Sequence, residues 1–415
     1  MNQTLPPQPW MDHPATRRVM DALCDAGGED SARFVGGCVR DALLGRGVTD
    51  IDVATTLDPD SVTRALTEAG IRAIPTGILH GTVTAATAGR TLEITTLRRD
   101  VETDGRHARV AFTDDWSEDA ARRDFTFNAL YADRRGAVFD PTGLGVDDLR
   151  AGRVAFVGDP ATRIEEDALR ILRFFRFLAW FGRGPPDRAA LAACQARREL
   201  VADLSGERLA KELLRLLAAD DPREAVGLMA STQVLFVLLP QAVGLTRFEG
   251  LVRIETEQLF TCDPMLRLAA LLHDDPGAGL ATAEHLRLSN GDRDRLTGAL
   301  NGRPIVSWMS PREVRREIWR QGAGVLRDRV MLNWAASDRP AATTQWRALL
   351  PMIDSWPRPV FPLTGDEVLA AGVPPGPMVG KVLREVEAWW IDNDFTVDKL
   401  SLIERLKAVA QGMIY

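Results

Sequence analysis

The segment from Arg33 to Thr56, RFVGGCVRDALLGRGVTDIDVATT, carries the pattern that decides the fold of the first part of the chain. A short apolar run ends at a pair of glycines, a helical pattern follows, and a second apolar run spans residues 51–55. Gly45 is a natural left-handed cap for the intervening helix. The order strand, glycine turn, helix and strand predicts an α/β unit.

Two carboxylates lie on the second predicted strand of this segment. Asp50 and Asp52 are two residues apart, so their side chains are expected on the same face of the strand. Two hard oxygen ligands on one face suit Mg²⁺, which keeps several waters and takes few protein ligands. An isolated D-x-D pattern is more often a solvent-exposed strand face. The residues that precede the pair in the sequence favour a metal site at Asp50 and Asp52.

These preceding residues form a glycine turn at the start of the predicted helix. Gly36 and Gly37 allow backbone N–H groups at a helix amino terminus to approach a phosphate, and Arg40 lies one turn further in. Arg40 can therefore add charge-assisted hydrogen bonds. The pattern is neither G-x-G-x-x-G nor a Walker A loop, so dinucleotide binding and P-loop hydrolysis both fit poorly. We expect a phosphate-bearing substrate beside a divalent cation.

Composition sets the class of protein. The chain has 415 residues, 45% apolar and 26% charged, which is ordinary for a globular protein of about three compact units. Four cysteines without a CxxC pair indicate neither a disulfide framework nor a cysteine zinc site. No secretory leader or long apolar run is visible, so we expect a cytoplasmic protein with no membrane partner. The net charge of −7 argues against a surface that is basic throughout.

The pattern of apolar residues changes along the chain. To about residue 150, short β-like runs alternate with helices, and a hairpin is expected from 82–86 and 92–97. From Ala161 onward a 3.6-residue periodicity dominates. We predict an α+β multidomain protein with a head at 1–150, a helical neck at 151–240, and a helical body and tail at 241–415.

Three later segments, together with the first, identify a family resemblance. They occur in the family's order and are LEITTLRRDVETDGRHARVAFTDDW (92–116), DAARRDFTFNALYAD (119–133) and FVGDPATRIEEDALRILRFFRF (156–177). The chain resembles the class II tRNA nucleotidyltransferases and their poly(A) polymerase relatives, within the polymerase β-like nucleotidyltransferase superfamily. The resemblance covers residues 31 to about 216. It implies a head of mixed sheet and helices followed by an all-α neck, body and tail.

The resemblance implies roles for further residues. Glu93, on the predicted hairpin, would complete an acidic triad with Asp50 and Asp52, although an ordinary exposed strand glutamate fits its position too. Three residues at a predicted helix start would hold the sugar and phosphates of an incoming nucleotide: Arg123, Asp124 and Asn128.

The stretch EEDALRILRFFRF (165–177) predicts one continuous helix with a polar face. That face spans a sector of roughly 120° and carries Arg163, Glu166, Asp167, Arg170 and Arg173. Cytosine and adenine share an amino donor beside a ring-nitrogen acceptor, so Asp167 as acceptor and Arg170 as donor match them and oppose guanine and uracil. A set of i,i+3 and i,i+4 ion pairs on an exposed helix would explain the same pattern.

The resemblance adds Arg173 and Arg176 to the residues expected near the nucleotide. The implied function is template-independent addition of CCA to the 3′ end of tRNA from CTP and ATP with Mg²⁺, releasing pyrophosphate. The distal helices would bind the acceptor and T arms of the tRNA, and the chain would be a monomer or a homodimer. The segment from Arg163 to Arg215, with eleven Lys or Arg against eight Asp or Glu, is the first candidate for nucleic-acid contact.

Two alternatives use the same scaffold: a poly(A) polymerase, and a split CC-adding or A-adding enzyme. The segment RRDVETDGRHARV (98–110) looks like the flexible loop that complete CCA-adding enzymes keep, and no long basic carboxy-terminal tail is present. Both features favour the complete reaction. A catalytically inactive RNA-binding protein is a third reading, but it would be expected to lack some of the acidic residues.

Overall fold

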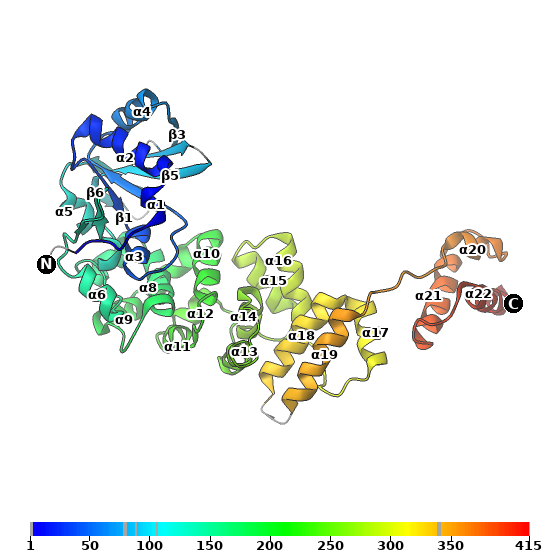
Figure 1. Ribbon diagram of the computed structural model, residues 1–415. Coiled ribbons are helices and arrows are strands. Elements are labelled where there is room, and N and C mark those ends of the chain that lie inside the picture. Colours follow the sequence, from blue (N-terminus) through cyan, green and yellow to red (C-terminus); the bar gives the residue numbers. More distant parts are fainter. Residues whose placement is uncertain (1–2, 78–80, 88, 105–106, 338–341, 415) are drawn as a thin grey trace. The chain divides into compact units, whose positions relative to one another are not determined.

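The computed structural model describes residues 3–77, 81–87, 89–104, 107–337 and 342–414. The chain divides into two compact units, Met1–Pro240 and Gln241–Tyr415 (Figure 1). Among the described residues, no helix has the length and apolarity needed to span a membrane.

A seven-stranded mixed sheet forms the centre of the first unit. Its strand order is β3-β4-β5-β2-β1-β8-β9, and a separate two-stranded sheet pairs β6 with β7. The strands of the larger sheet are β1 (Ala32–Val35), β2 (Asp52–Thr55), β3 (Arg72–Gly77), β4 (Thr82–Thr87), β5 (Arg90–Thr96), β8 (Tyr131–Ala132) and β9 (Val138–Phe139). Only the β2–β5 pair among these described strands is parallel. The expected hairpin is confirmed as β4 and β5.

Helices pack around this sheet and continue into a helical layer. They are α1 (Pro9–Asp12), α2 (Pro14–Gly27), α3 (Gly37–Leu43), α4 (Pro59–Glu68), α5 (Trp116–Ala121), α6 (Gly145–Ala151), α7 (Pro160–Glu166), α8 (Leu169–Phe181), α9 (Arg188–Ala196), α10 (Gly206–Leu217), α11 (Arg223–Ser231) and α12 (Val234–Leu238). Short 3₁₀ turns occupy η2 (Thr126–Asn128) and η3 (Arg198–Asp203). The prediction of a mixed-sheet head followed by helices is confirmed.

Aromatic side chains join the sheet to the helical layer. Phe125 packs edge-on against Phe177 of α8, with ring centroids 5.1 Å apart, and lies 4.7 Å from the ring of Phe156. Phe174 of α8 stacks on Phe156 at 5.8 Å. All four side chains are buried, and each large aromatic contributes substantial apolar area to a core. The head and the start of the neck therefore share one hydrophobic core.

Two local predictions were wrong. The segment 98–110 is not a loop in its described backbone, because β6 (Arg98–Asp104) pairs with β7 (His107–Phe112) as an antiparallel hairpin. Asp50 does not belong to the second strand, because β2 begins at Asp52.

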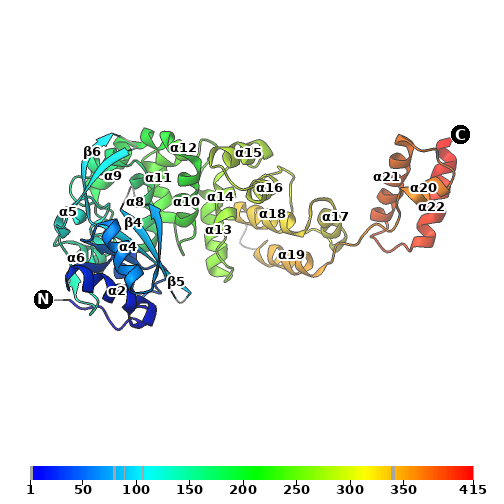
Figure 2. The ribbon, with the colours of Figure 1, turned by 90° about the horizontal axis from the view of Figure 1, so that it is seen from above.

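The second unit is helical throughout its described elements. These are α13 (Thr246–Glu257), α14 (Pro264–Leu271), α15 (Pro276–His285), α16 (Asn290–Ala299), α17 (Pro311–Gln321), α18 (Ala323–Ala336), α19 (Thr343–Ser355), α20 (Gly365–Ala370), α21 (Pro377–Asp392) and α22 (Lys399–Ile414). In both Figure 1 and Figure 2, α18 and α19 run alongside each other. The last three helices enclose their own apolar cluster around Val386, Trp390 and Leu402.

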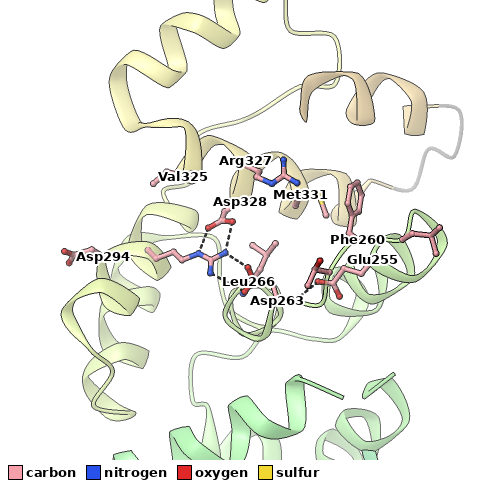
Figure 3. Close-up of a pocket in the computed structure, with 13 residues that line it drawn as sticks. Glu255, Phe260, Asp263, Leu266, Asp294, Val325, Arg327, Asp328 and Met331 are labelled. Carbon is pink, nitrogen blue, oxygen red and sulfur yellow. Dashed lines mark hydrogen bonds and ion pairs between the residues drawn. The ribbon is translucent and has the colours of Figure 1, made fainter. Parts of the chain in front are cut away.

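A pocket of about 750 Å³ lies among the first helices of this unit (Figure 3). Arg295 of α16 reaches across it to Asp263, which caps the start of α14, and to Asp328 of α18. The distances from its guanidinium nitrogens are 2.5 Å to Asp263 Oδ2 and 2.7 Å to Asp328 Oδ2. These charge-assisted bonds tie three helices together.

The contact between α13 and α18 yields a test of the second unit's packing. A methyl group added at Gly250 would lie 2.1 Å from the backbone oxygen of Ala335, so Gly250→Ala should destabilise the chain by about 1–3 kcal/mol or more. Gly324→Ala, in the first turn of α18 with open space around it, serves as the control and should be neutral or slightly stabilising. Urea unfolding of both variants measures the difference, and equal midpoints would contradict the packing described.

Candidate active site

Two acidic side chains meet where the parallel strands run side by side. Asp52 is the first residue of β2, and its register partner on β5 is Glu93. Register partners in a sheet project to the same face, so the two carboxylates are neighbours. Glu93 is exposed and Asp52 is partly buried, which leaves the pair open to solvent. Asp50 lies just before β2, exposed, and close enough to affect Asp52 electrostatically.

The carboxyl group of Asp52 has an unusual acidity. Burial raises its pKa from the ordinary 3.8 to about 6, and the negative charges of Glu93 and Asp50 act in the same direction. The Arg123 guanidinium opposes them and lowers the pKa. A carboxylate held among like charges is destabilised when ionised, and a bound cation would relieve that repulsion.

The donor set suits a divalent cation with few protein ligands. Within the described parts of the chain, no group of three or more His, Cys, Asp or Glu side chains is arranged to hold a metal ion. The acids at this site therefore do not form a closed ligand cage. Mg²⁺ usually keeps several waters and binds through one or two carboxylates plus substrate phosphates, so an open pair of carboxylates fits that ion.

The glycine turn borders the same region. Gly36 has φ of +69°, a conformation that glycine adopts without strain, and its N–H donates to the Leu130 carbonyl oxygen at 3.1 Å. A Cβ at Gly36 would lie 3.8 Å from Nη1 of Arg123. Gly37 begins α3, and a Cβ there would lie 3.8 Å from Nη2 of Arg40. Two predicted phosphate-binding arginines therefore lie beside the two glycines.

A chain of polar contacts extends from Arg40 into the neck. Arg40 Nη1 donates to Asn128 Oδ1 at 2.8 Å, and Asn128 Nδ2 donates to Asp124 Oδ1 at 3.0 Å. Asp124 Oδ2 in turn accepts from Arg173 Nε of α8 at 2.7 Å. Burial raises the pKa of the Asp124 carboxyl, but Arg173 and Asn128 outweigh burial, so that its pKa lies below the ordinary value. Four predicted nucleotide-binding residues thus form one connected network.

The network continues through α10. Glu212 is buried and accepts from Arg176 Nε at 2.6 Å, and one of its oxygens lies 3.8 Å from Arg173 Nη1. The predicted nucleotide contacts Arg173 and Arg176 are therefore both held by one carboxylate that the sequence analysis did not single out. Its only signal in the sequence is an acidic residue at an apolar position of an amphipathic helix.

Asp119 is a second functional residue that the sequence analysis missed. It is buried near the end of α5, where Oδ2 accepts from Arg123 Nε at 3.0 Å and from the Tyr131 hydroxyl at 2.7 Å. Oδ1 accepts from Arg122 Nη2 at 2.5 Å. Burial alone would raise the pKa of Asp119, but Arg123 and Arg122 lower it to about 2. Asp119 therefore holds the guanidinium group of Arg123, the arginine that lowers the pKa of Asp52.

The prediction that Arg123, Asp124 and Asn128 share a helix start was wrong. Helix α5 ends at Ala121 with Arg122 as its C-cap, and Asn128 lies in the separate 3₁₀ turn η2. Arg123 and Asp124 lie in a bend between them, and Phe125 is extended, with φ of −122° and ψ of 147°. Asp124 and Asn128 nevertheless come together through their hydrogen bond across this turn.

The predicted continuous helix was also wrong, because it is broken at the residue expected to read the base. Helix α7 ends at Glu166, Asp167 has φ of −151° and ψ of 103°, and α8 begins at Leu169. The polar face is consequently divided between two helices. Arg163 and Arg173 lie on different helices, so the sector calculated for a single helix does not apply.

The break separates the partners of Asp167 and Arg170. Arg170 Nη1 donates to Glu166 Oε2 at 2.5 Å, and Nη2 donates to the Arg122 carbonyl oxygen at 3.0 Å. Arg163 pairs with the same Glu166 at 2.5 Å. Asp167 instead accepts from Arg208 of α10. Ion pairs at i,i+3 and i,i+4, the alternative reading of this segment, are therefore present alongside the proposed base-reading residues.

Comparison with known proteins identifies relatives along almost the whole chain. Residues 32–155 match the family described as the poly A polymerase head domain, and residues 186–244 match the probable RNA and SrmB-binding site of polymerase A. The chain is 32% identical over 396 residues to the mitochondrial CCA tRNA nucleotidyltransferase 1 of Homo sapiens, covering 90% of this chain and 86% of that protein.

Solved structures are similar as well. The Bacillus stearothermophilus CCA-adding enzyme in complex with CTP has a TM-score of 0.74 and 25% identity, covering 96% of this chain and 100% of that one. The Thermotoga maritima CCA-adding enzyme complexed with tRNA_CCA has a TM-score of 0.67 and 20% identity, with 94% of each chain covered. The second likeness concerns the fold.

The acidity of Asp52 predicts that its charge costs stability. Because its folded pKa lies above 3.8, the folded state holds a proton that the unfolded state releases, so its contribution to stability falls as pH rises from about 4 to 6. Asp52→Asn, in EDTA at pH 7.5, should therefore raise the free energy of unfolding by up to about 3 kcal/mol. Urea melts at pH 4 and 7.5 measure this. Variant and parent should converge at pH 4, and a less stable variant at pH 7.5 would contradict the site described.

Asp119 predicts the opposite sign. Its folded pKa lies below 3.8, so it stabilises the fold above about pH 4, and this contribution is lost as pH falls towards 2. Asp119→Asn should destabilise the chain at pH 7.5 by about 3 kcal/mol, because two arginines lose their buried partner. The exposed Asp114 supplies the control, and Asp114→Asn should change stability by less than about 0.5 kcal/mol. Similar urea midpoints for the two variants would count against this role of Asp119.

Proposed function

We propose a set of residue roles from one premise. This chain belongs to the family of CCA-adding tRNA nucleotidyltransferases, as its 32% identity to a named member over 86% of that protein's length shows. It is an enzyme that adds CCA to the 3′ end of tRNA, with CTP and ATP as substrates. The observation that supports the catalytic assignment best is the in-register pair Asp52 and Glu93, with Arg123 beside it.

The acidic residues Asp50, Asp52 and Glu93 would hold Mg²⁺. When bound, this ion supplies Lewis-acid activation of the tRNA 3′ hydroxyl and neutralises charge on the pyrophosphate that leaves. The raised pKa of Asp52 supports this assignment, since the ionised carboxylate is poorly stabilised by the protein alone. Arg123, which lowers the pKa of Asp52 and is held by Asp119, would contact the nucleotide phosphates.

The remaining head residues would bind the nucleotide's triphosphate and sugar. Gly37 would offer its backbone N–H at the start of α3, Gly36 would allow close approach, and Arg40 would supply charge. Asp124 and Asn128 are buried and hydrogen-bonded to each other, so they would hold the ribose through groups that are already fixed in place. Preorganised polar groups of this kind lose little entropy when substrate binds.

The base would be chosen by Asp167 and Arg170, with Arg173 and Arg176 close to the nucleotide. A carboxylate acceptor and a guanidinium donor match the amino group and ring nitrogen of cytosine and adenine, and they oppose the carbonyl and N–H of guanine and uracil. Protein side chains would thus replace a nucleic-acid template. In this proposal the helix break at Asp167 keeps its carboxylate out of the ion pairs that Glu166 forms with Arg163 and Arg170.

The tRNA would lie against the neck and the helical second unit, which would bind its acceptor and T arms mainly through phosphates. Such binding weakens as salt rises, because it releases counterions. The match of residues 186–244 to an RNA-binding family segment supports the neck as part of this surface. The cytoplasmic location stays a prediction, as does the monomeric or dimeric state, and the human relative is named as mitochondrial.

The activity is tested with tRNA transcripts that end before CCA, after one C and after two. Each is incubated with CTP, ATP, GTP or UTP, singly and together, in Mg²⁺. We expect C, C and A to be added in that order, with negligible addition of G or U. Long A tails would replace this function with poly(A) synthesis, and arrest after two C residues would indicate a CC-adding enzyme.

The same assay tests the acid at the centre of the site. Asp52→Asn should abolish nucleotide addition while leaving the Kd for tRNA within about threefold, because a phosphate-dominated RNA surface does not need this carboxylate. Glu68→Gln, an exposed acid on α4, provides the matched control with normal activity. Equal loss of addition and tRNA binding in the Asp52 variant would mean that Asp52 is structural.

A further inference from the structure

Asp167 is held by two donors from different parts of the neck. Its Oδ1 accepts from the backbone N–H of Leu169 at 3.1 Å, at the start of α8. Nη2 of Arg208, on α10, donates to both carboxylate oxygens, at 3.0 Å to Oδ1 and 2.9 Å to Oδ2. Oδ1 therefore has two donors, whereas Oδ2 has Arg208 alone among these contacts and keeps a lone pair to offer.

Arg208 is one of two charged residues of α10 that form ion pairs with Asp167 and with α8. Helices α8 and α10 pack side by side, as Figures 1 and 2 both show. Arg208 and Glu212 are one turn apart on α10, with Arg208 opposite Asp167 and Glu212 opposite Arg173 and Arg176. The signs are complementary in each pair. One face of α10 thus contacts three residues that the proposed function assigns to the nucleotide.

We propose that Arg208 is a positioning residue for base selection, acting through Asp167. This inference rests on the proposed role of Asp167 in reading the base. The terminal torsion of an aspartate is broad, so a carboxylate that is 36% exposed would otherwise rotate freely. Donors from α8 and α10 together fix its plane. Reading a base edge requires placement to within about 0.5 Å and 10–20°.

The exposure of the pair makes this role separable from a structural one. The side chains of Arg208 and Asp167 are 48% and 36% exposed, and ion pairs of that exposure contribute little to stability. Glu212 is different, since it is 5% exposed and its loss would remove the carboxylate that binds Arg176 and leave Arg173 with Asp124 alone. Arg208 is therefore the one of these two α10 residues that can be replaced while the neck stays folded.

The test compares three arginine variants of the full chain. Arg208→Gln removes the charge, Arg208→Lys keeps a donor, and Arg197→Gln breaks a similar ion pair, to Glu165 of α7 at 2.6 Å, away from Asp167. Single-turnover kcat/KM is measured for CTP and UTP on tRNA that ends before CCA, and for ATP and GTP on tRNA that ends in CC.

Arg208→Gln should lower the preference for CTP over UTP, and for ATP over GTP, by about fivefold or more, the lower end of what one well-placed base contact discriminates. Arg208→Lys should restore part of the preference. Arg197→Gln should leave it unchanged. Thermal unfolding should give similar midpoints for all three variants.

Asp167→Asn separates failure of this inference from failure of the proposed function. If Asp167→Asn loses base preference but Arg208→Gln keeps it, Arg208 does not position the carboxylate and the inference is overturned, while the proposed function stands. An equal fall for all four nucleotides in Arg208→Gln would also overturn it, because a structural role would produce that result. If Asp167→Asn keeps full preference, both the base-reading role and this inference fail.

Discussion

The ion pair between the buried Asp124 and the partly exposed Arg173 is the interaction on which the site's geometry depends. Asp124 follows α5 in the chain, just before the 3₁₀ turn η2, whereas Arg173 lies on α8, so the pair connects the catalytic head to the neck. A buried charge is tolerated only when it is paired and hydrogen-bonded, and Asn128 supplies the remaining bond to Asp124. The aromatic core formed by Phe125, Phe156, Phe174 and Phe177 joins the same parts of the chain, so the sheet and the first neck helices are connected by apolar packing as well as by charge.

This connection brings together the two tasks of the proposed function, cation binding on the sheet and base selection in the neck. On the sheet, Asp52 is crowded by like charges and is poorly stabilised when ionised, which prepares it for a cation. In the neck, every charged residue assigned to the nucleotide already has a partner of opposite sign, as Arg176 has in Glu212. In the proposed function, catalysis would draw on a carboxylate that lacks an ion-pair partner among the described residues, and base selection would draw on charges that are already paired.

Much of this was predictable from the sequence, and the failures have local physical causes. The glycine turn and the β4–β5 hairpin were confirmed because each rests on a short-range pattern, and the family resemblance was confirmed because four such patterns occur in the family's order. The break at Asp167 was not predictable from periodicity, since a residue with good helical neighbours left the helix to bond Leu169 and a distant arginine. Asp119 and Glu212 were missed for a related reason. A buried acid looks like any surface acid until the arginines around it are known.

The most direct test of this account is a crystal structure of the chain with Mg²⁺ and a CTP analogue that cannot react. The head and neck should then share one nucleotide. We predict a metal ion on Asp50 and Asp52 beside the phosphates, and the cytosine amino group within hydrogen-bonding distance of the Asp167 carboxylate. A nucleotide bound with its base away from Asp167 and Arg170, or with no metal at the acids, would contradict the account.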